Sequence, residues 1–220
     1  MLRLAPLWLA LGSSAVAQVP PPAAADLAPA AAEAPGVVEL ELSGLDGEQR
    51  AAALAALDIA AYTTRGTIGS ARLERLLGEA PDEIRTALEV FGYYAASARV
   101  EHSPLPERRH RVAITVERGE PTVVAEATVV IDGPAAAEEP IARRVAAFAP
   151  GPGAVLDHRV YEAGKAGIER SMQRLGYFDA QLVEHRVEVT RATRSAVIRL
   201  RWTSGERYRF GATRHEGAQF

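Results

Sequence analysis

The 220-residue sequence predicts an α+β protein made of tandem β-α-α-β-β domains. Two observations lead to this fold class. Segments with apolar residues at three- and four-residue steps, the spacing of an amphipathic helix, are interspersed with segments in which apolar and polar residues alternate, the pattern of a half-buried strand. In addition, the order of these segments in the first half of the chain is repeated in the second half.

Short motifs at nearly equal spacing support the repeat. Phe91-Gly92-Tyr93-Tyr94 corresponds to Leu175-Gly176-Tyr177-Phe178, and Gly176 follows Gly92 by 84 residues. Two more pairs agree: the Gly of Glu-Arg-Gly-Glu at 117–120 precedes that of Thr-Ser-Gly-Glu at 203–206 by 86 residues, and Ile131-Asp132-Gly133 precedes His215-Glu216-Gly217 by 84. A period of this length is larger than a solenoid unit and indicates repeated small domains.

The first domain is predicted over residues 37–118. Alternation at Val37–Leu42 indicates its first strand, and a clean alternating stretch at Arg111–Glu117 indicates its last. Between them we expect a helix, a loop, a second helix and a weak strand. The Ala-rich first helix is expected over residues 46–60, with Leu54 and Leu57 pointing inward, and the loop over 63–69. The second helix is expected over residues 70–92 and carries the apolar residues Leu73, Leu76 and Leu77. The weak strand is expected at Tyr94–His102 and its turn at Pro104–Glu107.

Pro81 is expected to interrupt the second helix. Ser70 is expected to cap the first part of this helix. Proline followed by Asp82 and Glu83 has the composition of a helix's first turn, because the missing N–H is not needed there and acidic side chains favour that end. The sequence therefore predicts that the helix restarts at Pro81.

The second domain, predicted over residues 119–204, repeats this order. The expected elements are a strand at Val123–Ile131, a helix at Glu138–Phe148, a break at Pro150–Gly153, a helix at Asp157–Leu175 and a hairpin of Gln181–Thr190 with Ser195–Thr203. In the last strand, Ala196, Ile198, Leu200 and Trp202 are expected to point one way, and Arg199 and Arg201 the other.

The second helix of this domain has clear ends. Asp157 is a plausible N-cap, and Gly176 lies where a left-handed C′ residue ends a helix. Its predicted buried stripe is Val160, Gly164, Ile168, Met172 and Leu175. The segment Gly164-Lys165-Ala166-Gly167, inside this helix, is expected to allow close helix packing.

The first 36 residues have the composition of a leader and a tether. Arg3, a short apolar run and the small residues Ala15-Val16-Ala17 indicate a signal peptide over residues 1–17, cleaved before Gln18. A membrane anchor is the alternative, but the apolar run is shorter than the about 20 residues that a helix needs to cross a bilayer. Residues 18–36, rich in Pro and Ala, are expected to be a disordered tether.

Residues 205–220 are expected to begin a third domain. Tyr208–Gly211 has the pattern of that domain's first strand, and the sequence stops at Phe220 before the rest can form. We expect a truncated or fragmentary product, since a lone strand has little to pack against. The alternative is a natural end in which this strand docks on the second domain.

Composition argues against several classes of function. A net charge of −3 does not suggest a nucleic-acid partner, and without cysteine there is no thiol catalysis. The five histidines lack the HExxH spacing, and His158 with Glu162 would supply only two zinc ligands. Neither a G-x-S-x-G elbow nor a phosphate-binding GxxxxGK[ST] loop is present. We therefore expect no enzymatic activity, no catalytic residue, no metal and no cofactor.

The order of strand, two helices, glycine–aromatic turn, hairpin and Gly-rich step resembles the polypeptide-transport-associated (POTRA) domain of the outer-membrane Omp85 superfamily. Leu175–Asp179 and Ser204–Gly211 are most similar to the TamA (translocation and assembly module) family within it. The resemblance covers about residues 37–220. It implies that each domain is a three-stranded mixed sheet covered on one face by two helices.

The resemblance also implies a function and partners. The protein is expected in the periplasm at the outer membrane, where it would bind unfolded β-rich clients such as autotransporters and relay them for outer-membrane insertion. A TamB-like protein anchored in the inner membrane is the expected partner. Attachment to the outer membrane is expected through a C-terminal barrel that this sequence lacks. Three alternatives stay open: another Omp85 protein such as the general barrel-assembly subunit, a stand-alone periplasmic binding module, and a small periplasmic hydrolase.

Two sets of residues are candidates for function. An extended client could add as a strand to a sheet edge, and in POTRA domains the strand after the second helix is usually an edge. The candidate edge residues are Ser97, Arg99, Glu101, Val183, His185, Val187 and Val189. The aromatic residues of the glycine turns, Gly92-Tyr93-Tyr94 and Gly176-Tyr177-Phe178, either cap the core where helix meets strand or form a client-binding patch. Which edge is free is left open.

Overall fold

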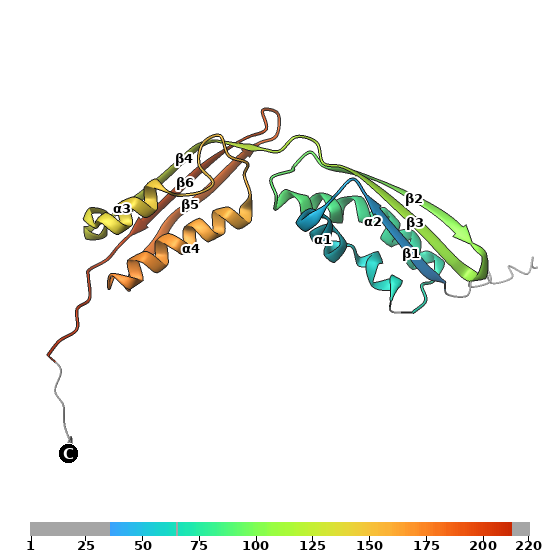
Figure 1. The fold of residues 1–220 in the computed structure, drawn as a ribbon, viewed down its shortest axis with the longest axis horizontal. Coiled ribbons are helices and arrows are strands. Elements are labelled where there is room, and N and C mark those ends of the chain that lie inside the picture. Colours follow the sequence, from blue (N-terminus) through green and yellow to red (C-terminus); the bar gives the residue numbers. More distant parts are fainter. Residues whose placement is uncertain (1–35, 65, 213–220) are drawn as a thin grey trace, which may run out of the picture. The chain divides into compact units, whose positions relative to one another are not determined.

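The computed structural model describes residues 36–64 and 66–212, which form two successive groups of a three-stranded sheet with helices (Figure 1). The predicted signal peptide (1–17), the tether except Gly36, and residues 213–220 lie outside the described residues. The first group, here the N-terminal module, runs from β1 to β3; the second, the C-terminal module, runs from β4 to β6.

The N-terminal module contains β1 (Val37–Ser43), α1 (Gly47–Ala56), the 3-10 helix η1 (Asp58–Thr63), α2 (Ser70–Glu89), β2 (Ser97–Leu105), the short turn η2 (Pro106–Arg108) and β3 (Arg109–Glu117). The C-terminal module contains β4 (Val123–Asp132), η3 (Pro134–Ala137), α3 (Glu139–Ala146), α4 (His158–Arg174), β5 (Gln181–Thr190) and β6 (Ser195–Thr203).

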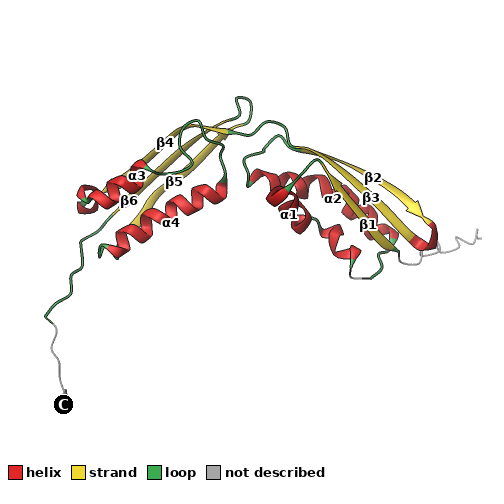
Figure 2. Cartoon of the chain, viewed as in Figure 1, coloured by secondary structure: helices red, strands yellow, loops and turns green. Residues whose placement is uncertain are grey.

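Both sheets have the same topology. The strand orders are β1-β3-β2 and β4-β6-β5, so the last strand of each module lies in the centre. It pairs in parallel with the first strand and antiparallel with the second. In each module the helices lie on one face of the sheet (Figure 2). The predicted fold class, an α+β tandem of three-stranded mixed sheets, is confirmed.

Each module has its own apolar core. The alternation predicted for β3 and β6 is realised, because Val112, Ile114 and Val116 are buried on one face of the first sheet. Ala196, Ile198, Leu200 and Trp202 are likewise buried in the second. The residues that helix α2 contributes to the first core are Leu73, Leu76, Ala80, Ile84 and Leu88.

The predicted break at Pro81 is wrong. Helix α2 runs through Pro81 without interruption, and it begins at Ser70 after Gly69, with no side-chain hydrogen bond at its cap. Its buried stripe keeps steps of three or four residues on both sides of the proline, so one continuous helix buries all five residues at once. This packing outweighs the about 3 kcal/mol that an internal proline costs.

Two other helices differ from the prediction in detail. Helix α1 stops at Ala56 and a 3-10 turn follows, with Leu57 and Ile59 buried and Leu54 only half-buried. On α4, Tyr161 is buried in place of the predicted Val160, which is 41 % exposed. The aromatic ring removes more apolar surface from water than valine, and the helix is rotated accordingly.

The predicted ends of α4 are confirmed, and Gly164 allows the segment that follows α3 to approach the helix closely. Asp157 Oδ1 accepts hydrogen bonds from the backbone N–H of Arg159 (2.9 Å) and Val160 (3.4 Å). Gly176 has φ +92°, a left-handed conformation. A Cβ at Gly164 would come within 2.7 Å of the carbonyl oxygen of Ala149 and 2.8 Å of the Phe148 ring, so glycine permits the close packing.

Two strand predictions need correction. The weak strand starts later and runs longer than Tyr94–His102, since β2 spans Ser97–Leu105 and includes the predicted turn residue Pro104. The stretch Tyr208–Gly211 is not a strand, because no strand of the described part of the chain pairs with it.

Candidate strand-docking edges and helix–strand junctions

Strands β2 and β5 are each an outer strand of their sheet. Strand β2 pairs only with β3, and β5 only with β6, among the residues that the structure describes. Every second residue of such a strand turns its N–H and C=O away from the sheet. The chemistry that an edge offers another chain therefore depends on which residues these are.

On β5, the outward groups belong to His185, Val187 and Val189. The N–H of Ser204, at the end of β6, donates to the Asp132 carbonyl on β4 (2.8 Å). Alternate residues back along β6, including Leu200, Ile198 and Ala196, therefore face β4 rather than β5. Their partners across the antiparallel pair are His185, Val187 and Val189, whose main-chain groups must then point outward.

Strand β2 alternates in the same manner. The hydroxyl of Ser43 on β1 donates to the carbonyl of Ile114 (3.3 Å), so the main-chain groups of Ile114 face β1. Val100, its partner on β2, then points its N–H and C=O outward, as do Ala98 and His102.

Pro104 agrees with this assignment. It falls at an outward position of β2, where a missing N–H leaves no ladder bond unmade. The candidate residues Ser97, Arg99 and Glu101 lie at the intervening positions, so their main-chain groups face β3 while their side chains are exposed.

The opposite edges, β1 and β4, are partly occupied by the chain itself. Beside β1, Gly36 exchanges two backbone hydrogen bonds with Ile68 (2.9 and 2.7 Å), and Arg50 donates to the Leu42 carbonyl (3.0 Å). Beside β4, Val124 donates to Ala154 and accepts from Gly153, both at 2.8 Å. Among the described residues no such bridge covers β2 or β5.

A β-bulge changes the pattern at the start of β5. Leu182 pairs with Trp202 and Glu184 with Arg201, which leaves Val183 without a partner and 53 % exposed. The predicted regular alternation over Val183, His185, Val187 and Val189 therefore holds only from His185 onward. Val187 and Val189 pack against the core, whereas His185 lies on the same face but is exposed. Bulges are a common feature of edge strands because they disturb unwanted pairing.

Ion pairs cover the outer face of the second sheet. Arg199 of β6 pairs with Glu188 (3.1 Å), and Arg201 with Glu184 (3.6 Å) and Asp132 (3.3 Å). These side chains are 40–50 % exposed, so each pair contributes little to stability, about 0–1 kcal/mol. Because these charged side chains are exposed, the outer face of the sheet stays polar. A main-chain contact with another strand can therefore form at the edge strand and not on this face.

The two glycine–aromatic turns have closely similar geometry. Gly92 has φ +87° and Gly176 φ +92°. The Gly92 carbonyl accepts from the N–H of Thr122, and the Gly176 carbonyl accepts from that of Tyr208, both at 2.8 Å. Because Tyr208 follows Thr122 by 86 residues, the segment after β6 repeats the step that leads from β3 into β4.

The four aromatic residues of these turns have different environments. Tyr177 is buried in the second core and donates to Glu138 (3.2 Å), and Tyr93 is half-buried with the Arg118 guanidinium 5.8 Å from its ring centre. Tyr94 is half-buried, packs against the C-terminal module's core and hydrogen-bonds His158 (2.5 Å). Phe178 is 64 % exposed. Core packing accounts for three of them, and only Phe178 has the exposure that a binding patch requires.

Phe178 lines an open cleft of about 770 Å³. Its ring lies 5.9 Å from that of Tyr208, and the Tyr208 hydroxyl donates to Asp179 (2.8 Å). Phe210 is fully exposed beside them. The rest of the lining comes from the end of α4 and the segment after β6: Gln173, Arg174, Leu175, Gly176, Arg207 and Arg209.

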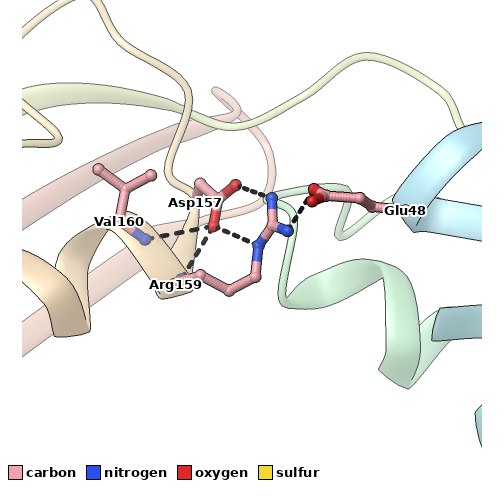
Figure 3. Close-up of polar contacts among 4 residues, drawn as sticks. All are labelled: Glu48, Asp157, Arg159 and Val160. Atoms are coloured by element: carbon pink, nitrogen blue, oxygen red, sulfur yellow. Dashed lines mark hydrogen bonds and ion pairs between the residues drawn. The ribbon is translucent and has the colours of Figure 1, made fainter.

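A polar cluster at the start of α4 was not expected from the sequence. Arg159 donates to Asp157 through Nε (3.1 Å) and Nη2 (2.6 Å) and to Glu48 of α1 through Nη1 (2.5 Å), as Figure 3 shows. Its guanidinium also lies 4.3 Å from the ring centre of Phe91. The hydrogen bonds from Arg159 lower the pKa of Asp157. Glu48 and Arg159 are 111 residues apart, and no local pattern predicts such a pair.

The described residues contain no group of three or more His, Cys, Asp or Glu side chains arranged to hold a metal ion.

None of the helices within 36–64 and 66–212 combines the length and the apolar character needed to cross a membrane.

Comparison with known proteins relates the first module to POTRA domains. Residues 39–118 match the family model described as POTRA domain, TamA domain 1. This match covers nearly all of the N-terminal module, from β1 to the end of β3. The N-terminal module is thus similar to the first POTRA domain of TamA.

Solved structures with similarity over most of the chain include POTRA domains of BamA and Omp85. Haemophilus influenzae BamA POTRA3-5 is 16 % identical, with a TM-score of 0.36 over 82 % of this chain and 70 % of that one. The N-terminal domain of Omp85 from Thermosynechococcus elongatus is 19 % identical, with a TM-score of 0.35 over 76 % of this chain and 61 % of that one. POTRA1-3 of Omp85 from Anabaena is 18 % identical, with a TM-score of 0.36 over 76 % of this chain and 59 % of that one.

Proposed function

We propose that the chain is the periplasmic POTRA region of a TamA-like outer-membrane assembly factor, which binds unfolded β-rich clients by strand addition at β2 and β5. The observation that carries the proposal is the direction of the main-chain groups. Ala98, Val100 and His102 on one edge and His185, Val187 and Val189 on the other present N–H and C=O groups outward. An added strand would complete these ladders with little regard to client sequence.

The contrast between the two edges of each sheet supports this choice. Where β1 and β4 begin, the chain already supplies hydrogen-bond partners to the outward groups, through Gly36–Ile68 and through Val124 with Gly153 and Ala154. A client strand would have to displace them. Along β2 and β5 it would meet groups that are solvated, so less competing structure must be broken.

The side chains beside these edges define the kind of strand that fits. On the helix face, the edge residues are the half-buried Ala98 and Val100 on β2 and Val187 and Val189 on β5. On the other face they are charged, such as Arg99, Glu101 and Arg186. A strand with alternating apolar and polar residues would place its apolar side beside the helices, and outer-membrane proteins and autotransporters would supply such strands.

The other parts of the proposal follow from the similarity of residues 39–118 to a TamA POTRA domain. The module would act by binding and relay, without catalysis. Its second partner would be a TamB-like protein anchored in the inner membrane, and residues from 205 onward would lead into a third domain. A general barrel-assembly subunit and a stand-alone binding module are the alternatives, distinguished by the number of POTRA domains in the complete gene product.

The test compares proline at neighbouring positions of β5. Val187→Pro removes an outward N–H and leaves the hydrogen bonds to β6 in place. Arg186→Pro, its matched control, removes an N–H that pairs with β6. We expect Val187→Pro to keep a cooperative thermal transition and to reduce crosslinking of a urea-unfolded autotransporter barrel to a photoreactive residue at position 185 by about tenfold. Arg186→Pro is expected to destabilise the C-terminal module.

The result that would overturn strand addition is full crosslinking to folded Val187→Pro. The pair Ala98→Pro and Arg99→Pro repeats the test on β2. Ala98→Pro removes an outward N–H, and Arg99→Pro removes an N–H that pairs with β3. If both outward variants fold and bind normally, clients bind elsewhere on the chain.

A further inference from the structure

Two histidines face each other near the turn that closes the β2–β3 hairpin. His102 Nε2 lies 3.1 Å from His110 Nδ1, and the two rings are tilted by 38° with their centres 5.2 Å apart. His102 is exposed and His110 half-buried. The proposed function uses only the main chain of His102 and does not use His110.

The strands hold both rings in place. His102 pairs with Val112 and His110 with Pro104, so the two histidines are diagonal neighbours on one face of the sheet. A turn at 106–108 joins the strands, with Glu107 and Arg108 both at positive φ. Gly36 crosses close to His110, since a Cβ there would lie 2.6 Å from Nε2.

The distance between the nitrogens fits a shared metal ion. A late first-row divalent cation binds imidazole nitrogen at about 2.0–2.1 Å. With both nitrogens at that distance and 3.1 Å apart, the angle at the metal is about 98°. This value lies between the right angle of a square-planar site and the tetrahedral angle.

The protonation of the rings also fits. A neutral histidine offers one nitrogen with a lone pair and carries its proton on the other. With His102 protonated on Nδ1 and His110 on Nε2, both lone pairs would point into the gap. The ring that now donates the hydrogen bond between the two histidines would move its proton to its other nitrogen. Metal binding would therefore release no net proton.

We propose that His102 and His110 form a two-histidine site for a late first-row divalent transition metal, with Cu²⁺ preferred over Ni²⁺ and Zn²⁺. The preference follows the general order of affinity for nitrogen ligands. Solvent would complete the coordination, since two imidazoles fill only part of it. A bound ion would link β2 to β3 and stabilise the folded hairpin by mass action.

The experiment titrates Cu²⁺, Ni²⁺ and Zn²⁺ into the whole chain and records electron paramagnetic resonance of the copper form. We expect one Cu²⁺ bound with two imidazole nitrogens, and a larger thermal stabilisation by Cu²⁺ than by Ni²⁺ or Zn²⁺. His102→Ala and His110→Ala should each weaken this binding by about tenfold or more and leave one nitrogen in the spectrum. His185→Ala, which changes an exposed histidine on β5, is the matched control and should change neither.

The double variant His102→Ala/His110→Ala measures what the rest of the chain binds. Unfolding midpoints without metal establish that each variant is folded, and His102→Asn, of similar size, replaces any alanine variant that is not. The site is refuted if the double variant binds Cu²⁺ as the unmodified chain does, or if removing either histidine leaves the two-nitrogen signal. Binding that is lost with His185→Ala would place the metal on β5 and also contradict the assignment.

Discussion

The two glycine–aromatic turns share one backbone geometry but have different surroundings. At Gly92 the turn is covered, because a Cβ there would come within 2.7 Å of the Leu156 carbonyl and Tyr94 packs on the C-terminal module's core. At Gly176, within the part of the chain that the structure describes, it is the short segment around Tyr208 that lies against the turn, and Phe178, the counterpart of Tyr94, is 64 % exposed. The local motif therefore sets the turn, and contacts with residues further along the chain decide whether its aromatic ring is buried.

The largest effect is expected within one turn, between Tyr177 and Phe178. Tyr177→Ala opens a cavity in the second core and removes a hydrogen bond to Glu138, so the unfolding midpoint should fall by about 10 °C or more. Phe178→Ala removes an exposed ring and should leave the midpoint nearly unchanged. Equal effects in thermal denaturation would mean that the turn buries both rings.

The two turn glycines provide the next comparison. Alanine at either position adopts a left-handed conformation at a cost of about 1–2 kcal/mol. Gly92→Ala should cost more than Gly176→Ala, since Leu156 is buried and cannot retreat, whereas the Tyr208 segment is more exposed and can. Urea denaturation of both variants measures the difference, and a larger loss for Gly176→Ala would contradict this account.

The N-caps of α4 and α2 differ in their hydrogen bonds: the Asp157 side chain accepts from the helix, whereas Gly69 has no side chain to do so. Asp157→Ala should lower the free energy of unfolding by about 1 kcal/mol, the usual contribution of an N-cap. Gly69→Ala removes no side-chain hydrogen bond at the start of α2 and should have the smaller effect. Chemical denaturation at pH 7 compares them.

Acid should act through Asp157. Hydrogen bonds from Arg159 lower the pKa of this carboxyl below its value in the unfolded chain. The stabilisation is therefore complete above the unfolded pKa and is lost as the pH falls through the folded pKa. Denaturation curves from pH 7 to pH 3 should show a smaller decline for Asp157→Asn, and parallel declines would remove Asp157 from the acid response.

The smallest effect is expected for Glu48. The pair with Arg159 is charged but exposed, with the Glu48 side chain 76 % accessible, so Glu48→Gln should cost at most about 1 kcal/mol and less in high salt. A double-mutant cycle with Arg159→Gln isolates the pair. A coupling that high salt does not reduce would point to a contact other than the ion pair.

Most elements could be predicted because their signals are local. Alternation on β3 and β6 and the ends of α4 at Asp157 and Gly176 each depend on residues within a few positions. Pro81 misled the prediction because the penalty of a proline is local, whereas the packing that offsets it extends along the whole of α2. The bulge at Val183 was missed for a similar reason, since register depends on the partner strand.

The amino-acid sequence by itself determined the order of strands and helices, the repeat and the glycine turns, since periodicity and backbone preference act over short distances. Only the tertiary structure decided which strands are edges, which main-chain groups point outward, and that His102 and His110 lie together. These properties come from pairing between segments far apart in the chain. The hydrogen bonds of Ser204 with Asp132 and of Ser43 with Ile114, which define the outward direction, span 72 and 71 residues respectively.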